Sequence, residues 1–234
     1  MVQLIHEILD SSTIRESPKW EDGNKIRDGV FKRAPNEMTE LAAQWKVAPD
    51  ELERKTAEMI NAVVYFTGGA QKPKLNKHVK FDFFYMHSLN SSIFFSAFLN
   101  EKWLSVENKC RLLEWKGRFD LAMYASRGSP EPLMEEIKNY EPKKPEQDWS
   151  GIIERVDNHP DDGHASKLIR ALAHGEKACQ PYEGESDETF PIKRDMWLKL
   201  GHMAIDSVEI GGPSWVRNAG FDQAWNDVPE RARL

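Results

Sequence analysis

Cysteine is scarce in this sequence. Only Cys110 and Cys179 occur among 234 residues, and neither has a partner in a CxxC pair. Two isolated thiols give no disulfide framework and fit a reducing compartment. The first residues, 1–7, lack the basic and apolar regions of a secretory signal. We therefore expect cytoplasmic localisation.

An excess of basic residues is also missing. The formal net charge is −6 at pH 7, which argues against binding to nucleic acid or to an anionic membrane. One basic cluster is short and fits a solvated loop; it consists of Lys72, Lys74, Lys77 and Lys80. We expect neither a nucleic-acid partner nor a membrane partner.

Polar residues interrupt the most apolar segment of the chain, 81–99. Asp82, His87 and Asn90 fall within it. A membrane span tolerates few such residues, so this segment predicts a buried helix and not a transmembrane one.

Internal repeats, low-complexity tracts and runs of β alternation are absent as well. Helical patterns alternate with Pro and Gly breaks, such as Gly68–Gly69 after a long amphipathic segment. We predict an all-α fold, a single multi-helix domain over 1–234 with apolar central helices. The predicted helices cover 50–67, 81–99, 106–125, 130–140, 164–174 and 192–208, with a brief amphipathic segment at 149–156 and a closing segment at 214–228.

His87 is the first candidate for chemistry. Asn90 and Ser91 follow three and four residues later, on the same face of the predicted helix. An unpaired buried polar group costs about 1–3 kcal/mol, so this stripe needs partners. Two interpretations stay open, namely a core histidine bonded to a neighbouring carbonyl, and a metal ligand or acid–base residue.

A second candidate begins at the turn before residue 164. Asp161 or Asp162 is expected to cap the following helix, on which His164 and Lys167 share a face and His174 lies near the same azimuth. The helix dipole at the first turn favours a neutral imidazole, the form that binds metals. A plain alternative is a capping turn with a solvent-facing lysine.

Lys167 would bind a metal only in a modified form, because lysine is normally protonated. A desolvated amine reacts with carbon dioxide to give a carbamate, which acts as a carboxylate on a long stem. Two imidazoles and such a group resemble the 2-His-1-carboxylate triad of non-haem iron enzymes. No HExxH, GxGxxG or P-loop pattern points to a different chemistry.

Tryptophan is comparatively abundant. We expect the eight indoles to be mainly core anchors on amphipathic helices, with an aromatic ligand pocket as the alternative. They are Trp20, Trp45, Trp103, Trp115, Trp149, Trp197, Trp215 and Trp225.

Three segments resemble the questin oxidase-like family: 80–95, 161–172 and 215–225. The family includes fungal enzymes that oxidatively open anthraquinone and related polyketide rings. Members have been described as Baeyer–Villiger-type oxidases that use a reduced nicotinamide, and also as non-haem iron dioxygenases with histidine ligands and a carboxylated lysine. The residues alone give NADPH no support, because no glycine-rich dinucleotide fingerprint is present.

The resemblance implies an oxidoreductase that cleaves an aromatic polyketide at an Fe(II) site. His87, His164 and Lys167 would be its metal-binding and catalytic residues. Five further positions are candidates for contact with the substrate: Phe84, Asn90, Ser91, Phe94 and His174.

Length separates this chain from the family. Members are much longer, and their N-terminal half carries a His-rich motif, Asn-His-x-x-His-His, that has no counterpart here. We therefore expect an incomplete site. Alternatives to a complete enzyme are a C-terminal fragment, one half of a split protein, a degenerate paralogue, and a non-catalytic helical module that needs an N-terminal partner half or forms a homo-oligomer.

Overall fold

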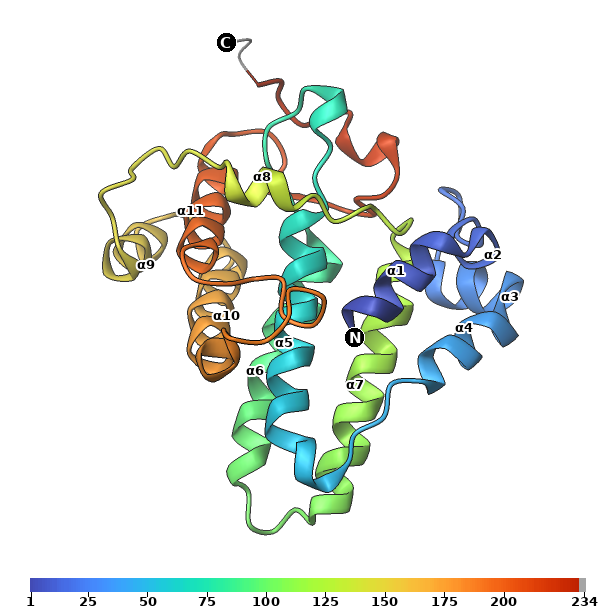
Figure 1. Cartoon of the computed structure of the whole chain (residues 1–234). Coiled ribbons are helices and arrows are strands. Elements are labelled where there is room, and N and C mark those ends of the chain that lie inside the picture. Colours follow the sequence, from blue (N-terminus) through green and yellow to red (C-terminus); the bar gives the residue numbers. More distant parts are fainter. Residues whose placement is uncertain (232–234) are drawn as a thin grey trace.

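A computed structural model describes residues 1–231 and shows an all-α protein, as predicted (Figure 1). The predicted domain over 1–234 ends in residues 232–234, which lie outside the described part. The α-helices are α1 (Val2–Asp10), α2 (Ser12–Arg15), α3 (Phe31–Arg33), α4 (Pro35–Ala43), α5 (Leu52–Gly69), α6 (Phe83–Asn100), α7 (Val106–Ser126), α8 (Met134–Lys138), α9 (Trp149–Asp157), α10 (His164–Cys179) and α11 (Met196–Glu209). Short turns of other types are a π-helical turn η1 (Lys25–Val30) and the 3-10 turns η2 (Pro49–Glu51), η3 (Pro73–Leu75), η4 (Gln180–Tyr182) and η5 (Asp222–Trp225).

Helix α5 is the centre of the core. Of its 18 residues, 15 are buried, because α6 and α7 pack on one side of it and α10 on another (Figure 1). The helix ends at Gly69, as the Gly68–Gly69 signal predicted. Gly68 also has a packing role, since a side chain there would collide with Leu200 of α11.

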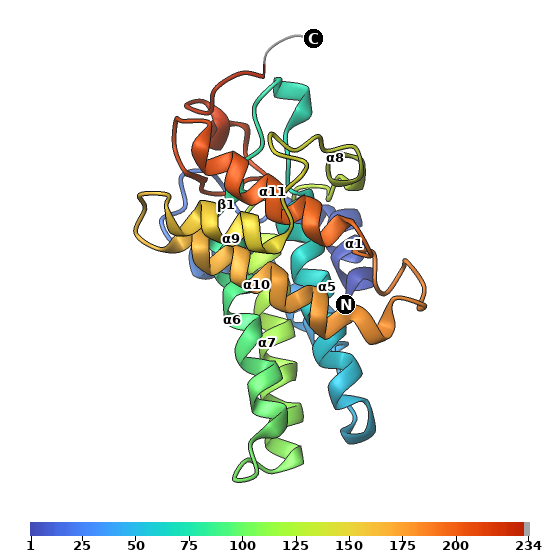
Figure 2. The ribbon, with the colours of Figure 1, turned by 90° about the vertical axis from the view of Figure 1, so that its left-hand side faces the viewer.

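Helices α6 and α7 form an antiparallel hairpin that extends beyond α10 in both views (Figures 1 and 2). Two lysines of α7 fix the pairing by donating hydrogen bonds to carbonyls of α6. Lys109 Nζ lies 2.8 Å from the carbonyl oxygen of Leu99, and Lys116 Nζ lies 2.9 Å from that of Ser88. Residues near 116 on α7 therefore lie beside residues near 88 on α6.

The prediction that 81–99 forms a buried helix is right for one face and wrong for the other. Tyr85, Met86 and Leu89 are fully buried, whereas His87 is exposed and Phe94 is 53 % exposed. Among the described residues, α5, α10 and α7 are the helices that pack most extensively on α6.

The closing segment, 214–228, contains no α-helix. Residues Trp215–Val216 form a short strand, β2, which pairs in parallel with β1 (Phe81–Asp82). The chain then turns at Asn218, which has a φ of 72°, and only a 3-10 turn follows. The reason is a long-range contact: the carboxylate of Asp82 accepts a hydrogen bond from the backbone N–H of Ala219 at 2.8 Å, and this bond holds the segment in an extended path.

Three predicted helices have different ends. α8 covers only Met134–Lys138, because the backbone before it is extended and the N–H of Leu133 bonds to the carbonyl of Gly69 at 2.8 Å. α11 starts at Met196, four residues later than expected, and α10 continues to Cys179.

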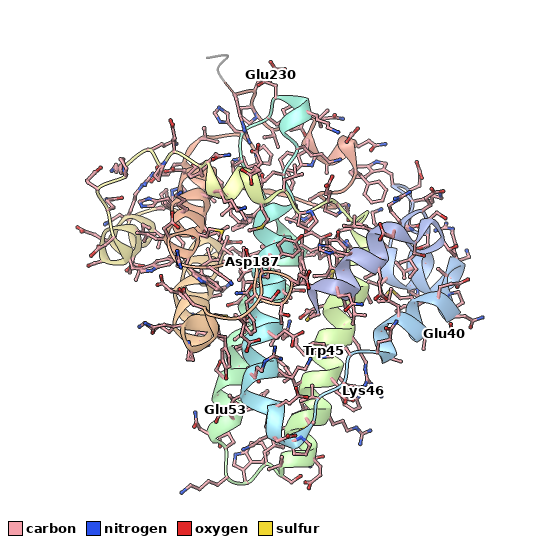
Figure 3. The ribbon with its side chains drawn as sticks, viewed as in Figure 1. Glu40, Trp45, Lys46, Glu53, Asp187 and Glu230 are labelled. Atoms are coloured by element: carbon pink, nitrogen blue, oxygen red, sulfur yellow. The ribbon has the colours of Figure 1, made fainter. Side chains whose placement is uncertain are left out.

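The tryptophans divide into buried and exposed groups, so the prediction of core anchors is only partly right. Trp45, Trp197 and Trp225 are buried, but Trp103 is 76 % and Trp115 is 52 % exposed. Figure 3 shows Trp45 beside α7, where its indole N–H donates to the carbonyl of Leu113 at 3.2 Å. Within residues 1–231, no helix has both the length and the hydropathy needed to cross a membrane.

Candidate functional site

His87 and His164 lie side by side although they are far apart in the sequence. Their ring centres are 5.2 Å apart and the rings are nearly perpendicular, at 87°. His87 is in the second turn of α6, and His164 is the first residue of α10. Phe83 contacts both rings, with centre-to-centre distances of 4.7 Å to His87 and 5.2 Å to His164. The packing of α10 on α6 therefore brings the two predicted histidines together.

The turn before α10 positions His164. Gly163 has a φ of 86°, a conformation that suits glycine. The prediction that Asp161 or Asp162 is the N-cap residue is wrong, because Gly163 holds that position. The carboxylate of Asp161 still accepts hydrogen bonds from the N–H groups of Gly163 at 2.7 Å and of Ala165 at 2.8 Å, the second of which lies in the first turn of α10. Asp162 accepts from the backbone N–H of His164 at 3.4 Å and also bonds to its ring, with Oδ1 2.5 Å from Nδ1.

The bond from Asp162 also selects a tautomer of His164. A carboxylate acceptor at Nδ1 favours the proton on that nitrogen, which leaves Nε2 with a free lone pair. Nε2 is then the nitrogen of His164 that is able to bind a metal ion or accept a proton.

Charges around His87 favour its neutral form. Partial burial lowers the pKa of His87 below its ordinary value, and the charges of His164, when that ring is protonated, and of Lys167 lower it further, while Asp162 opposes them. A neutral imidazole is the form that binds metals.

Aromatic and basic groups that the sequence did not single out surround the histidine pair. Trp215 of β2 lies 6.5 Å from His164 between ring centres, and the guanidinium of Arg217 lies 4.6 Å from the centre of the Phe83 ring. The segment 215–225 carried a family signature, but nothing in its sequence gave a reason to place Trp215 at this site. The β1–β2 pairing brings it there.

The five predicted substrate contacts do not form one group. Phe94 follows His87 by two helical turns on the same exposed face of α6, and Ser91 donates to the carbonyl of Ser88 at 2.9 Å. Asn90 is half-buried, and its Oδ1 has no hydrogen-bond partner within residues 1–231. Phe84 packs against the guanidinium of Arg127, 4.1 Å from the ring centre.

His174 lies away from the pair. It is ten residues beyond His164, which corresponds to about 15 Å along the helix axis, and its Nε2 lies 2.9 Å from Oγ of Ser96. Lys167 and His174 both line a groove of about 480 Å³ between α9 and α10, with Arg170, Lys177 and the apolar side chains of Ile153 and Val156. Burial and the charge of Lys177 lower the pKa of His174.

The site offers a metal ion two histidine ligands and few others. Two imidazoles bound to one ion at about 2.1 Å have ring centres roughly 5 Å apart, which fits the pair. Within residues 1–231, no group of three or more His, Cys, Asp or Glu side chains is arranged to hold a metal ion. Of the three predicted ligands, Lys167 is the remaining one, and it lies three residues after His164 on α10. The arrangement therefore fits part of a mononuclear site.

Known proteins resemble this chain over nearly its full length. Identity is 45 % over 232 residues with the Baeyer-Villiger monooxygenase dmxR6 of Cryptosporiopsis sp., covering 96 % of this chain and 52 % of the relative. It is 38 % over 236 residues with the questin oxidase of Aspergillus fumigatus, covering 98 % of this chain and 52 % of the relative. It is 44 % over 201 residues with the oxidoreductase AflY of Aspergillus parasiticus, covering 84 % and 40 %. The chain spans about half the length of these curated relatives.

The family model described as questin oxidase-like matches residues 1–172. This range includes the helices that carry both histidines and Lys167. The chain belongs to the questin oxidase-like family.

Proposed function

We propose that this chain carries the paired histidines of an oxidoreductase that opens a ring of an aromatic, anthraquinone-like polyketide at a non-haem iron site. The observation that carries the proposal is the contact between the rings of His87 and His164, with Lys167 one helical turn after His164 on α10. Relatives named as oxidases support the reaction class.

In this proposal Fe(II) is held by His87, by Nε2 of His164 and by Lys167 as a carbamate. The carbamate forms when the neutral amine adds to carbon dioxide and releases one proton, which turns a cationic side chain into an anionic oxygen donor. The iron would supply one-electron chemistry toward dioxygen when bound.

The chain's own residues prepare the site. Asp162 keeps the proton of His164 on Nδ1. Phe83 and Trp215 exclude water from one side of the pair, and the positive charge of Arg217 suits a phenolate or quinone oxygen. Phe94 offers an exposed ring on which a flat polyketide would stack.

Iron analysis of protein purified without chelators tests the proposal. We expect bound iron in the wild type and a marked loss in His164→Ala. His159→Ala is the matched control, because His159 lines a different groove together with Arg155 and Glu209. An iron-free wild type, or equal iron content in the wild type and His164→Ala, would overturn the proposal.

A second candidate is a Baeyer–Villiger-type oxidation, a reaction class that the names of several relatives state, in a metal-free form that depends on NADPH. Activity that survives exhaustive chelation but requires NADPH would support it. A third candidate is a helical module without activity of its own, which the half-length match to the relatives favours. A clean monomer with stoichiometric iron would count against it.

A further inference from the structure

Large apolar side chains are exposed on both helices of the α6–α7 hairpin. Phe94 on α6 is 53 % exposed, and Trp115 and Phe119 on α7 are 52 % and 53 % exposed. Soluble monomers seldom leave several large aromatic rings exposed on adjoining helices. This surface, which we call the hairpin face, therefore needs a physical explanation.

Trp115 and Phe119 are four residues apart and share one face of α7. Lys116 and Asp120 are buried and form an ion pair directed toward α6, where Lys116 also bonds to Ser88. Trp115 and Phe119 each precede one of these residues by one position, so they are turned away from the α6 contact and toward solvent.

The hairpin face also includes the candidate site. On α6, His87 and Phe94 are seven residues apart and share the exposed stripe. His87 contacts His164 at the start of α10, which packs on α6 (Figure 2). The exposed stripe of α6 thus reaches the two histidines.

Arginine side chains stack on the aromatic rings at the margins of this surface. Arg111 lies 4.6 Å from the centre of the Trp115 ring, and Arg217 lies 4.6 Å from that of Phe83. Tryptophan and arginine are enriched among the residues that dominate binding energy in protein interfaces. The composition is that of a protein-binding surface.

We propose that the hairpin face docks the polypeptide that corresponds to the half of the curated relatives not spanned by this chain. The relatives match 96–98 % of this chain but only 52 % of their own length. A helical partner with a matching apolar surface would bury Phe94, Trp115 and Phe119 and would close the exposed side of His87. The inference rests on the exposed rings and the length difference, and it does not require the iron proposal.

Binding between separately purified polypeptides tests the inference. The probe is the half of the Cryptosporiopsis relative that has no counterpart in this chain, and the measurement is sedimentation velocity followed by a titration. We expect a complex with the wild type. The triple variant Phe94→Ser, Trp115→Ser, Phe119→Ser should bind at least about thirtyfold more weakly, the loss expected for removal of dominant interface residues.

Trp103→Ser is the matched control. Trp103 is 76 % exposed but lies in the loop between α6 and α7, so its loss should leave affinity unchanged. Circular dichroism should show that all variants are folded. Three outcomes would overturn the inference: no complex with the wild type, equal affinity for the triple variant, or a wild-type homodimer that the triple variant abolishes. Iron content is measured separately, so failure of the iron proposal would not affect the result of the binding experiment.

Discussion

Asp162 Oδ1 lies 2.5 Å from Nδ1 of His164 and fixes both the orientation and the tautomer of that ring. The neighbouring Asp161 bonds only to backbone N–H groups in this turn. Of the two adjacent aspartates, only Asp162 bonds to the imidazole ring, so single substitutions can separate the effects of the two carboxylates.

Asp162→Ala should weaken metal binding while leaving the fold intact. Carboxylates that orient a metal-binding histidine typically contribute about 10–100-fold in affinity, so we expect a loss of that size. An equilibrium titration with Fe(II) under anaerobic conditions measures it.

Asp161→Ala is the control, because it should lower the free energy of unfolding by about 1 kcal/mol through loss of its hydrogen bonds to backbone N–H groups at the start of α10. We expect its Fe(II) affinity to stay close to that of the wild type. Equal affinities for Asp162→Ala and Asp161→Ala would contradict the orienting role of Asp162.

Lys80 should make stability depend on pH in the alkaline range. It is fully buried, and its ammonium donates to the carbonyls of Ser207 at 2.5 Å and Gly211 at 2.9 Å. Burial lowers the pKa of Lys80 to about 8, below the ordinary value of 10.5. Between these two pH values the unfolded chain binds more protons than the folded one, so this residue makes the free energy of unfolding rise with pH.

Urea denaturation at pH 8 to 10.5 measures this contribution, which is at most about 3 kcal/mol. In Lys80→Met the rise should be smaller, since groups that titrate in both proteins cancel in the comparison. Identical pH slopes for the two proteins would contradict the assignment to Lys80.

Gly117→Ala should destabilise the packing between α7 and the segment after α4. A side chain at 117 would collide with the indole of Trp45, which is 2 % exposed. Overpacking of this kind costs about 1–3 kcal/mol. Gly184→Ala is the control, because a side chain there would meet no atom of the described residues within 4 Å. Thermal unfolding of both variants should show a lower midpoint for Gly117→Ala alone.

Local sequence patterns predicted the long helices well. The stop at Gly69 and the start of α10 after the aspartate turn follow from signals within a few residues. The region 214–228 could not be predicted in this way, because its path depends on a bond between Asp82 and Ala219, which are 137 positions apart. A periodic apolar pattern carries no information about such a partner.

The candidate site, too, could be predicted only in part from local sequence patterns. Spacing singled out His87, His164 and Lys167, but it left a purely structural role open for each of them. The resemblance to family motifs favoured the functional interpretation, and the packing of α10 on α6 places the rings of His87 and His164 together. Trp215 was missed as a neighbour of His164, because only the β1–β2 pairing brings it there.

The central proposal is that His87 and His164 bind one metal ion together. Titration with Co(II), followed by its visible absorption, tests this most directly in the wild type, His87→Ala, His164→Ala and the double variant. We expect one equivalent to bind to the wild type, each single variant to lose most of the signal, and the double variant to be no worse than either. Single variants that retain the wild-type spectrum would contradict the proposal.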